Sequence, residues 1–130
     1  MNDNQVFIAG NFPSFKNSKQ YVGKGRLIMS KTVQKYLRQF EYQWKTIPYQ
    51  FANENYPLLV GFHFVRGTRH KFDFHNMVQG CADLMVKYGW IKDDSMDYFI
   101  PFPILSLENG EYYSYDKENP GVIIKVLNNE

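Results

Sequence analysis

The sequence has very little cysteine and no long apolar run. Cys81 is the single cysteine among 130 residues, so no disulfide can form within the chain. No stretch approaches the about 20 apolar residues that cross a bilayer. The start, MNDNQVFIAG, has Asp3 where a secretory signal would have a basic cluster. These absences argue against a secreted or membrane protein, and we expect a cytoplasmic one.

The chain also lacks internal repeats, low-complexity tracts and an obvious linker. Its length is enough to bury a hydrophobic core without disulfides or metals. We therefore expect residues 1–130 to form a single domain.

Positive and negative charges are divided between the two halves of the chain. Residues 1–72 hold eleven Lys or Arg against three Asp or Glu, whereas residues 73–130 hold four against ten. A basic half indicates a polyanionic partner, and an acidic half indicates a cation site. Two solvated faces without any partner would give the same division, so charge alone leaves both interpretations open.

Apolar periodicity predicts four strands and two helices. The strands are expected at 5–9, 57–65, 98–107 and 121–127, and the helices at 31–45, capped by Ser30, and at 74–88. The turn-rich, basic residues 11–25 are predicted to form a surface loop, and the prolines at 101 and 103 favour an edge strand or a break in the strand. This order predicts an α+β fold in which helices pack on a mixed sheet.

The second predicted helix separates apolar from polar side chains. Met77, Cys81 and Leu84 recur on one face, which is typical of a buried stripe. His75, Gln79 and Asp83 are spaced by four on the opposite face. Cys81 is therefore expected to be a small core residue, and His63, within an apolar strand, a satisfied core or interface histidine.

Acidic residues flank this helix at both ends. Asp73 precedes it, and Asp93-Asp94 follow it after a short tail. The helix is roughly 22 Å long, and six extended residues from Gly89 span about 20 Å. A tail that turns back at Gly89 would bring Asp93 and Asp94 beside Asp73 and His75. Asp83, about 15 Å from Asp73, is too far to share one ion and is expected to be structural.

Clustered carboxylates repel one another unless a cation neutralises them, and such oxygen ligands suit Mg²⁺. With the basic loop from Arg66 to Lys71 alongside, the expected substrate is a phosphodiester in nucleic acid. Each residue also has a simpler interpretation: Asp73 as a helix N-cap, Asp93-Asp94 as a polar turn, and His75 as a surface histidine.

The sequence Asp73-Phe-His75-Asn76, then Asp83-Leu84, Lys87-x-Gly89 and Asp93-Asp94 resembles the signature of RusA-type Holliday-junction resolvases. The approach strand 57–65 and the opening Pro13-Ser14, followed by a basic stretch and a helix, are also similar. The resemblance spans most of the chain, and residues 71–94 carry its specificity.

This resemblance implies a RusA-like two-layer fold and a homodimer, of phage or prophage origin, that binds four-way DNA junctions and nicks opposite strands symmetrically. It implies catalytic roles for Asp73, His75 and Asp94, with Asp93 as a further metal ligand and Asn76 and Gln79 in support. The residues expected to contact DNA phosphates are all basic: Lys16, Lys19, Lys24, Arg26, Arg66, Arg69 and Lys71.

Two positions depart from the family pattern. His75 stands where the family has an acid, which removes a negative charge and favours Mn²⁺ or Zn²⁺ over Mg²⁺. Gln79 stands where the family often has a lysine. Three functions therefore stay open: a metal-dependent junction endonuclease, a related protein that binds branched DNA without cutting it, and a small enzyme or interaction protein unrelated to DNA.

Overall fold

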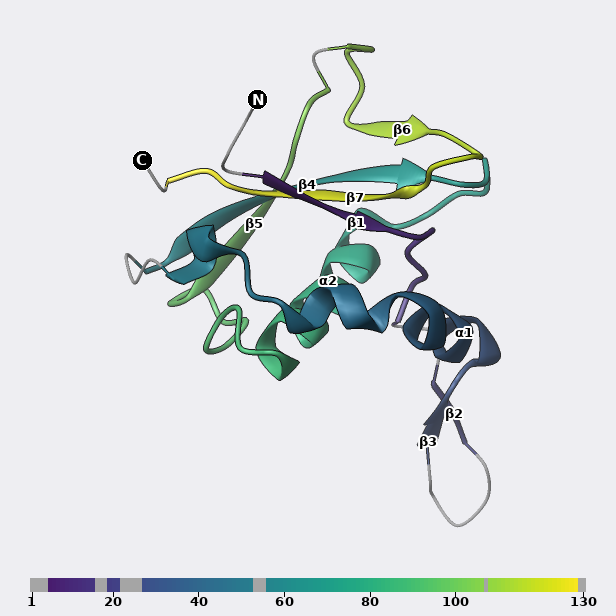
Figure 1. Cartoon of the computed structure of the whole chain (residues 1–130), viewed down its shortest axis with the longest axis horizontal. Helices are drawn as coiled ribbons and strands as arrows, with labels where there is room; N and C mark the ends of the chain where they lie inside the picture. The colour runs from purple at the N-terminus through teal and green to yellow at the C-terminus, as the bar shows by residue number, and fades with distance from the viewer. Residues whose placement is uncertain (1–4, 16–18, 22–26, 53–55, 107, 129–130) are drawn as a thin grey trace.

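The computed structural model describes residues 5–15, 19–21, 27–52, 56–106 and 108–128. For residues 19–21 and 27–29 it describes the backbone without the side chains. In this part of the chain a mixed sheet carries two α-helices on one face, which is a small α+β domain (Figure 1). The α+β class expected from the sequence is thus confirmed.

Four strands lie side by side in the order β1, β7, β4, β5. Their bounds are Gln5–Ala9, Gly121–Val126, Leu58–Arg66 and Phe99–Pro103. β7 is antiparallel to both β1 and β4, whereas β5 is parallel to the first half of β4. The short β6 (Tyr113–Tyr115) runs parallel to the last three residues of β4, so two strands share one edge of β4.

The N-terminal segment differs from the surface loop predicted for residues 11–25. Phe12 and Phe15 are 1% and 5% exposed, and their rings stack with centroids 5.4 Å apart. Further on, β2 (Lys19–Tyr21) pairs antiparallel with β3 (Leu27–Met29), and the pair projects from the body in Figure 1. For the described residues 11–15 and 19–21 the surface-loop prediction was wrong, because turn-forming neighbours hid two phenylalanines that bury their rings against Gly80 of α2 (Phe74–Lys87).

Helix α1 (Lys31–Phe40) begins as predicted, because the Ser30 hydroxyl accepts a hydrogen bond from the Val33 amide. It ends five residues earlier than expected and continues as the 3-10 helix η1 (Glu41–Lys45). The change of winding lets Gln43 exchange two hydrogen bonds with the backbone of Ala9 in β1. A second 3-10 helix, η2 (Tyr49–Ala52), follows before β4.

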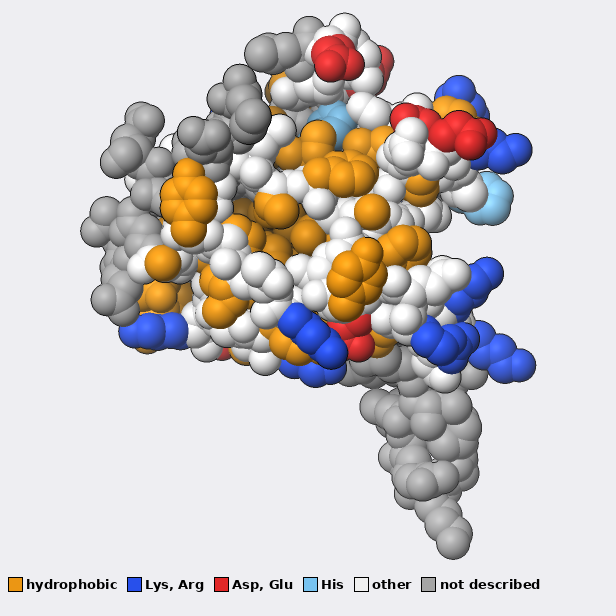
Figure 2. Space-filling view, viewed as in Figure 1, with side chains coloured by type: hydrophobic (Ala, Val, Ile, Leu, Met, Phe, Trp, Pro, Cys, Tyr) orange, Lys and Arg blue, Asp and Glu red, His pale blue; other side chains and the backbone are white. Residues whose placement is uncertain are grey.

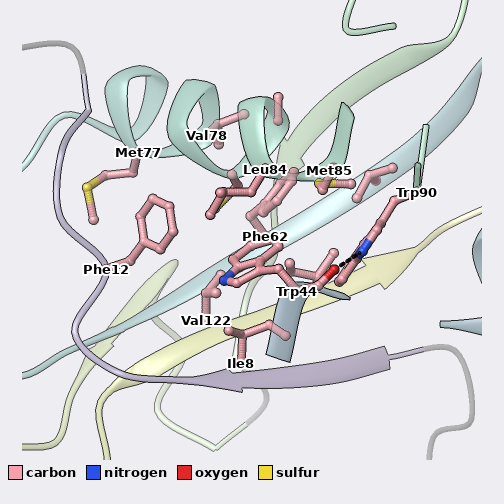
Figure 3. Packing of buried hydrophobic residues seen from close by; sticks show 14 of the residues in the cluster. Ile8, Phe12, Trp44, Phe62, Met77, Val78, Leu84, Met85, Trp90 and Val122 are labelled. Atoms are coloured by element: carbon pink, nitrogen blue, oxygen red, sulfur yellow. Dashed lines mark hydrogen bonds between the residues drawn. The ribbon is translucent and has the colours of Figure 1, made fainter. Parts of the chain in front are cut away.

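Helix α2 (Phe74–Lys87) packs its apolar stripe on the sheet, as Figure 3 shows for Met77, Leu84 and Met85. Cys81 lies on this stripe, and burial raises the pKa of its thiol well above the usual value. The helix ends where Gly89 adopts a φ of 82°, a left-handed conformation that favours glycine. Trp90 then enters the core, and its Nε1 donates to the Trp44 carbonyl at 2.7 Å.

The segment that connects β5 to β6 covers the face of the sheet that points away from the helices. Ile104 lies over Gly61, where even a Cβ atom would come within 2.4 Å of its side chain. His63 is 3% exposed, and its two ring nitrogens bond the Ile104 carbonyl and the Ser114 hydroxyl at 2.8 and 2.7 Å. The expectation that His63 is a satisfied core histidine is confirmed.

Candidate functional site

The N-terminal end of α2 presents Asp73 and His75 to solvent. Asp73 is the N-cap, and its Oδ1 accepts a hydrogen bond from the His75 amide at 2.9 Å. The ring of His75 packs edge-on against Phe74, with centroids 6.0 Å apart. Asn76 is half-buried beside them. The simpler interpretation of Asp73, as a helix cap, therefore holds whether or not the carboxylate has a second role.

A second polar cluster lies further along the same helix. The Gln79 side-chain nitrogen donates to Asp83 Oδ1 at 2.9 Å and to Asp94 Oδ2 at 3.1 Å. All three side chains are exposed. Gln79 and Asp83 are one turn apart on α2, whereas Asp94 comes from the tail after the helix. An amide group thus lies between two carboxylates that would otherwise repel each other.

The tail returns along α2 but stops short of the helix start. Gln79 is about 9 Å along the helix axis from Asp73, so Asp94 meets the second turn of α2 rather than its cap. The tail after α2 falls short because it is bent and not extended. Trp90 and Ile91, which are 1% and 2% exposed, turn this part of the chain into the core. Asp93 is exposed.

The sequence led us to expect a cation among Asp73, His75, Asp93 and Asp94. Their carboxylate and imidazole groups are suitable ligands for Mg²⁺ or Mn²⁺. Among the described residues, however, no group of three or more His, Cys, Asp or Glu side chains is close enough to hold a metal ion. The Gln79 amide lies between Asp83 and Asp94 and binds both. The four expected ligands therefore do not fit an ion as they are arranged.

Arg66, one of the expected phosphate contacts, is a buried residue. It is the last residue of β4, is 9% exposed, and donates from Nη1 to the Phe12 carbonyl at 3.0 Å. Its guanidinium carbon lies 4.9 Å from the centre of the Phe72 ring, and burial lowers its pKa. Arg66 therefore anchors the N-terminal segment from inside the fold, which its place in a basic stretch of sequence did not reveal.

Arg69 and Lys71 are exposed, as expected of residues that contact phosphates. The guanidinium of Arg69 stacks on the ring of Tyr115 in β6, 3.9 Å from its centre. Figure 2 shows Lys, Arg and His side chains along the edge of the molecule where β4 ends and α1 begins (right in the view), with acidic side chains among them near the end of β4. Along the chain, Arg69 and Lys71 precede Asp73 by four and two residues.

The remaining predicted contacts fall outside what the structure describes. Lys16, Lys24 and Arg26 lie beyond the described residues, and Lys19 belongs to β2, whose side chains are not described.

Sequence reasoning missed the aromatic residues around the basic loop. Tyr113 is 51% exposed and packs edge-on against Phe72, with ring centroids 5.2 Å apart. The alternation Tyr113-Ser114-Tyr115 is a signal for a strand with both tyrosines on one face, and it could have identified β6. That β6 lies beside the basic loop is a matter of tertiary structure.

Comparison with known proteins gave no support for a relationship: the chain matches no protein-family model and no curated protein sequence. The similarity to RusA-type resolvases therefore stays a prediction from the motif. None of the helices in the described part of the chain is long and apolar enough to cross a membrane.

Proposed function

We propose that the protein acts on branched DNA as a metal-dependent endonuclease of the kind that the sequence motif implies. The observation that carries the proposal is that a basic surface and an acidic one adjoin along the start of α2. The exposed cations Arg69 and Lys71 directly precede Asp73, and the exposed face of α2 then carries His75 and the cluster around Gln79.

In this proposal Arg69 and Lys71 bind backbone phosphates and orient the strand across the start of α2. A divalent ion supplies Lewis-acid chemistry and a more acidic bound water. Asp73, His75 and Asp94 would be its ligands, with Asp93 as a further one and Asn76 and Gln79 in support, and Asp94 would have to leave Gln79 to join the other two. Because an imidazole replaces a carboxylate at His75, we expect Mn²⁺ to support activity better than Mg²⁺.

The proposal includes a homodimer, whose two-fold axis would match that of a four-way junction and allow paired nicks. It also includes a site of action in the cytoplasm of a bacterium or phage-infected cell, where such DNA occurs.

The second candidate function is binding of branched DNA without cleavage. The separation of the acids favours it, because Asp94 is bound to Gln79 and the described residues contain no ready metal site. This candidate retains the role of Arg69 and Lys71 and gives the acids no catalytic role.

A labelled four-way junction incubated with the protein in Mg²⁺ or in Mn²⁺ separates the two candidates. Cleavage predicts symmetric nicks, slowed at least about tenfold in Asp94→Asn, since even outer carboxylates of metal sites are worth about 10- to 100-fold. Asp97→Asn, an exposed acid three residues further on, is the matched control and should cut normally.

Binding that weakens steeply with salt, without nicks in either metal, favours the second candidate. A chain that neither binds nor cuts the junction refutes both. Equal cutting in the two metals contradicts the role given to His75.

A further inference from the structure

A cavity of about 410 Å³ lies beyond the N-terminal end of α2. Its walls come from the end of β4, the loop that follows it, the first residue of α2, and β6. This volume is within the about 300–1,000 Å³ typical of small-molecule sites.

The cavity exists because the sheet extends further than the helix that covers it. In the pairing of β4 with β6, Phe64 lies opposite Tyr113 and Arg66 lies opposite Tyr115. Paired residues project to the same face of a sheet, so both tyrosines are on the face where Phe64 packs against Phe74 of α2. Since α2 begins only at Phe74, Tyr113 and Tyr115 are left largely exposed.

The cavity holds a buried cation without an anionic partner. Arg66 makes one hydrogen bond through Nη1, and its buried Nε has no hydrogen-bond partner. The ion pair found in the described part of the chain joins Lys87 to Glu41, elsewhere in the molecule. Arg69 and Lys71 add two exposed cations, and none of the described residues on the cavity wall is acidic. A buried charge with neither partner nor full hydration is costly, so an anion in the cavity is favoured.

The other walls are flat and aromatic. Phe72 packs edge-on with Tyr113, which is 51% exposed. The guanidinium carbon of Arg69 lies over the Tyr115 ring, 3.9 Å from its centre. Exposed tyrosine faces and stacked guanidinium planes are the surfaces on which nucleic-acid bases stack, independently of sequence.

We propose that this cavity binds a nucleotide, with its phosphate at Arg66, Arg69 and Lys71 and its base stacked on Tyr113. The ligand chemistry is a phosphate joined to a flat base, either as a free nucleoside monophosphate or as an unpaired nucleotide within a DNA strand. Binding of an unpaired nucleotide within DNA rests on the proposed function, because nucleotides at a branch point of DNA can unstack from their neighbours.

The free-nucleotide arm uses the whole protein in an NMR titration with dTMP, thymidine and inorganic phosphate. Saturable shifts are expected for amides of residues 66–74 and 113–115. We expect dTMP to bind about tenfold more tightly than inorganic phosphate, since stacking on an aromatic ring is worth about 5- to 150-fold, and more tightly than thymidine, which lacks the phosphate. Equal affinity for inorganic phosphate and dTMP overturns the assignment of the base.

Two variants test the location. Tyr113→Leu and Arg69→Gln should each weaken dTMP binding about tenfold, whereas the exposed Tyr42→Leu and Arg38→Gln, which lie outside the cavity, should not. Tyr113 and Arg69 are exposed, so the fold does not depend on them as it does on Arg66. Unchanged binding in both cavity variants places the nucleotide elsewhere and overturns the proposal.

The DNA arm compares a duplex with one bulged nucleotide, a fully paired duplex and a four-way junction. The proposal predicts about tenfold preference for the bulge over the paired duplex, lost in Tyr113→Leu. Junction binding with neither dTMP binding nor a bulge preference refutes the nucleotide cavity and leaves the proposed function standing. Tyr113-dependent dTMP binding without junction binding supports the cavity and refutes the proposed function.

Discussion

Replacing Gln79 with alanine removes the amide that joins Asp83 to Asp94 and keeps a strong helix former in α2. The two carboxylates are then left facing each other without a donor between them. A divalent ion between Asp83 and Asp94, a different position from that of the ion proposed at the start of α2, must first displace the amide from both carboxylates. In Gln79→Ala this competition is absent, so we expect the variant to bind Mn²⁺ more tightly.

The magnitude follows from the two hydrogen bonds, at 2.9 and 3.1 Å, both on the surface. Exposed interactions of this type contribute about 0.2–1 kcal/mol each, so the ion must overcome roughly 0.4–2 kcal/mol in all. This corresponds to a dissociation constant for Mn²⁺ that is about 2- to 30-fold lower in Gln79→Ala. Without metal, the same loss should lower the melting temperature by several degrees at most.

Thermal unfolding with and without Mn²⁺ measures both effects, because an ion that binds the native state raises Tm according to its affinity. Gln39→Ala, the same substitution on the exposed surface of α1, is the matched control and should respond to Mn²⁺ like the native protein. An identical Mn²⁺-dependent rise of Tm in Gln79→Ala and the native protein would refute the inference that the amide occupies an ion's place.

Two further predictions concern stability. The Tyr88 hydroxyl, and then Lys87, lower the pKa of the Glu41 carboxyl from its usual 4.5, so Glu41 stabilises the fold above that pH and ceases to do so as the pH falls through its folded pKa. Glu41→Gln should therefore cost less than about 1 kcal/mol at pH 7 in urea unfolding, and this cost should shrink as the pH is lowered below 4.5; a cost that does not fall with pH would contradict this. Gly80→Ala would place a Cβ 2.9 Å from the rings of Phe12 and Phe15. Overpacking costs about 1–3 kcal/mol and should outweigh the roughly 1 kcal/mol gain in helix propensity, so we expect Gly80→Ala to lower the free energy of unfolding. A higher free energy of unfolding would contradict this.

Most of the regular elements could be predicted because their signals are local. Strand β1 and both helix starts follow from residues within a few positions of each other, and Ser30 and Asp73 cap the helices as expected. The edge position of β5 follows from its prolines, which cannot donate to a further strand. The early end of α1 was not predictable, since Gln43 bonds a strand that lies distant in sequence.

The candidate site could be predicted only in part. Spacing by four correctly placed Gln79 and Asp83 together, because residues one helical turn apart are always neighbours. The position of Asp94 depends on how the chain bends to bury Trp90 and Ile91 in the core. No rule based on neighbouring residues predicts that bend.

The sequence by itself determined where α2 begins and ends, which of its faces is buried, and that the exposed cations Arg69 and Lys71 precede Asp73 at its start. Only the tertiary structure decided that Arg66 is buried, that Asp94 meets Gln79, and that Tyr113 lies beside the basic loop. The physical reason is the range of the interactions. Caps and helical stripes act within a turn or two, whereas strand pairing and core burial join residues that the chain keeps far apart.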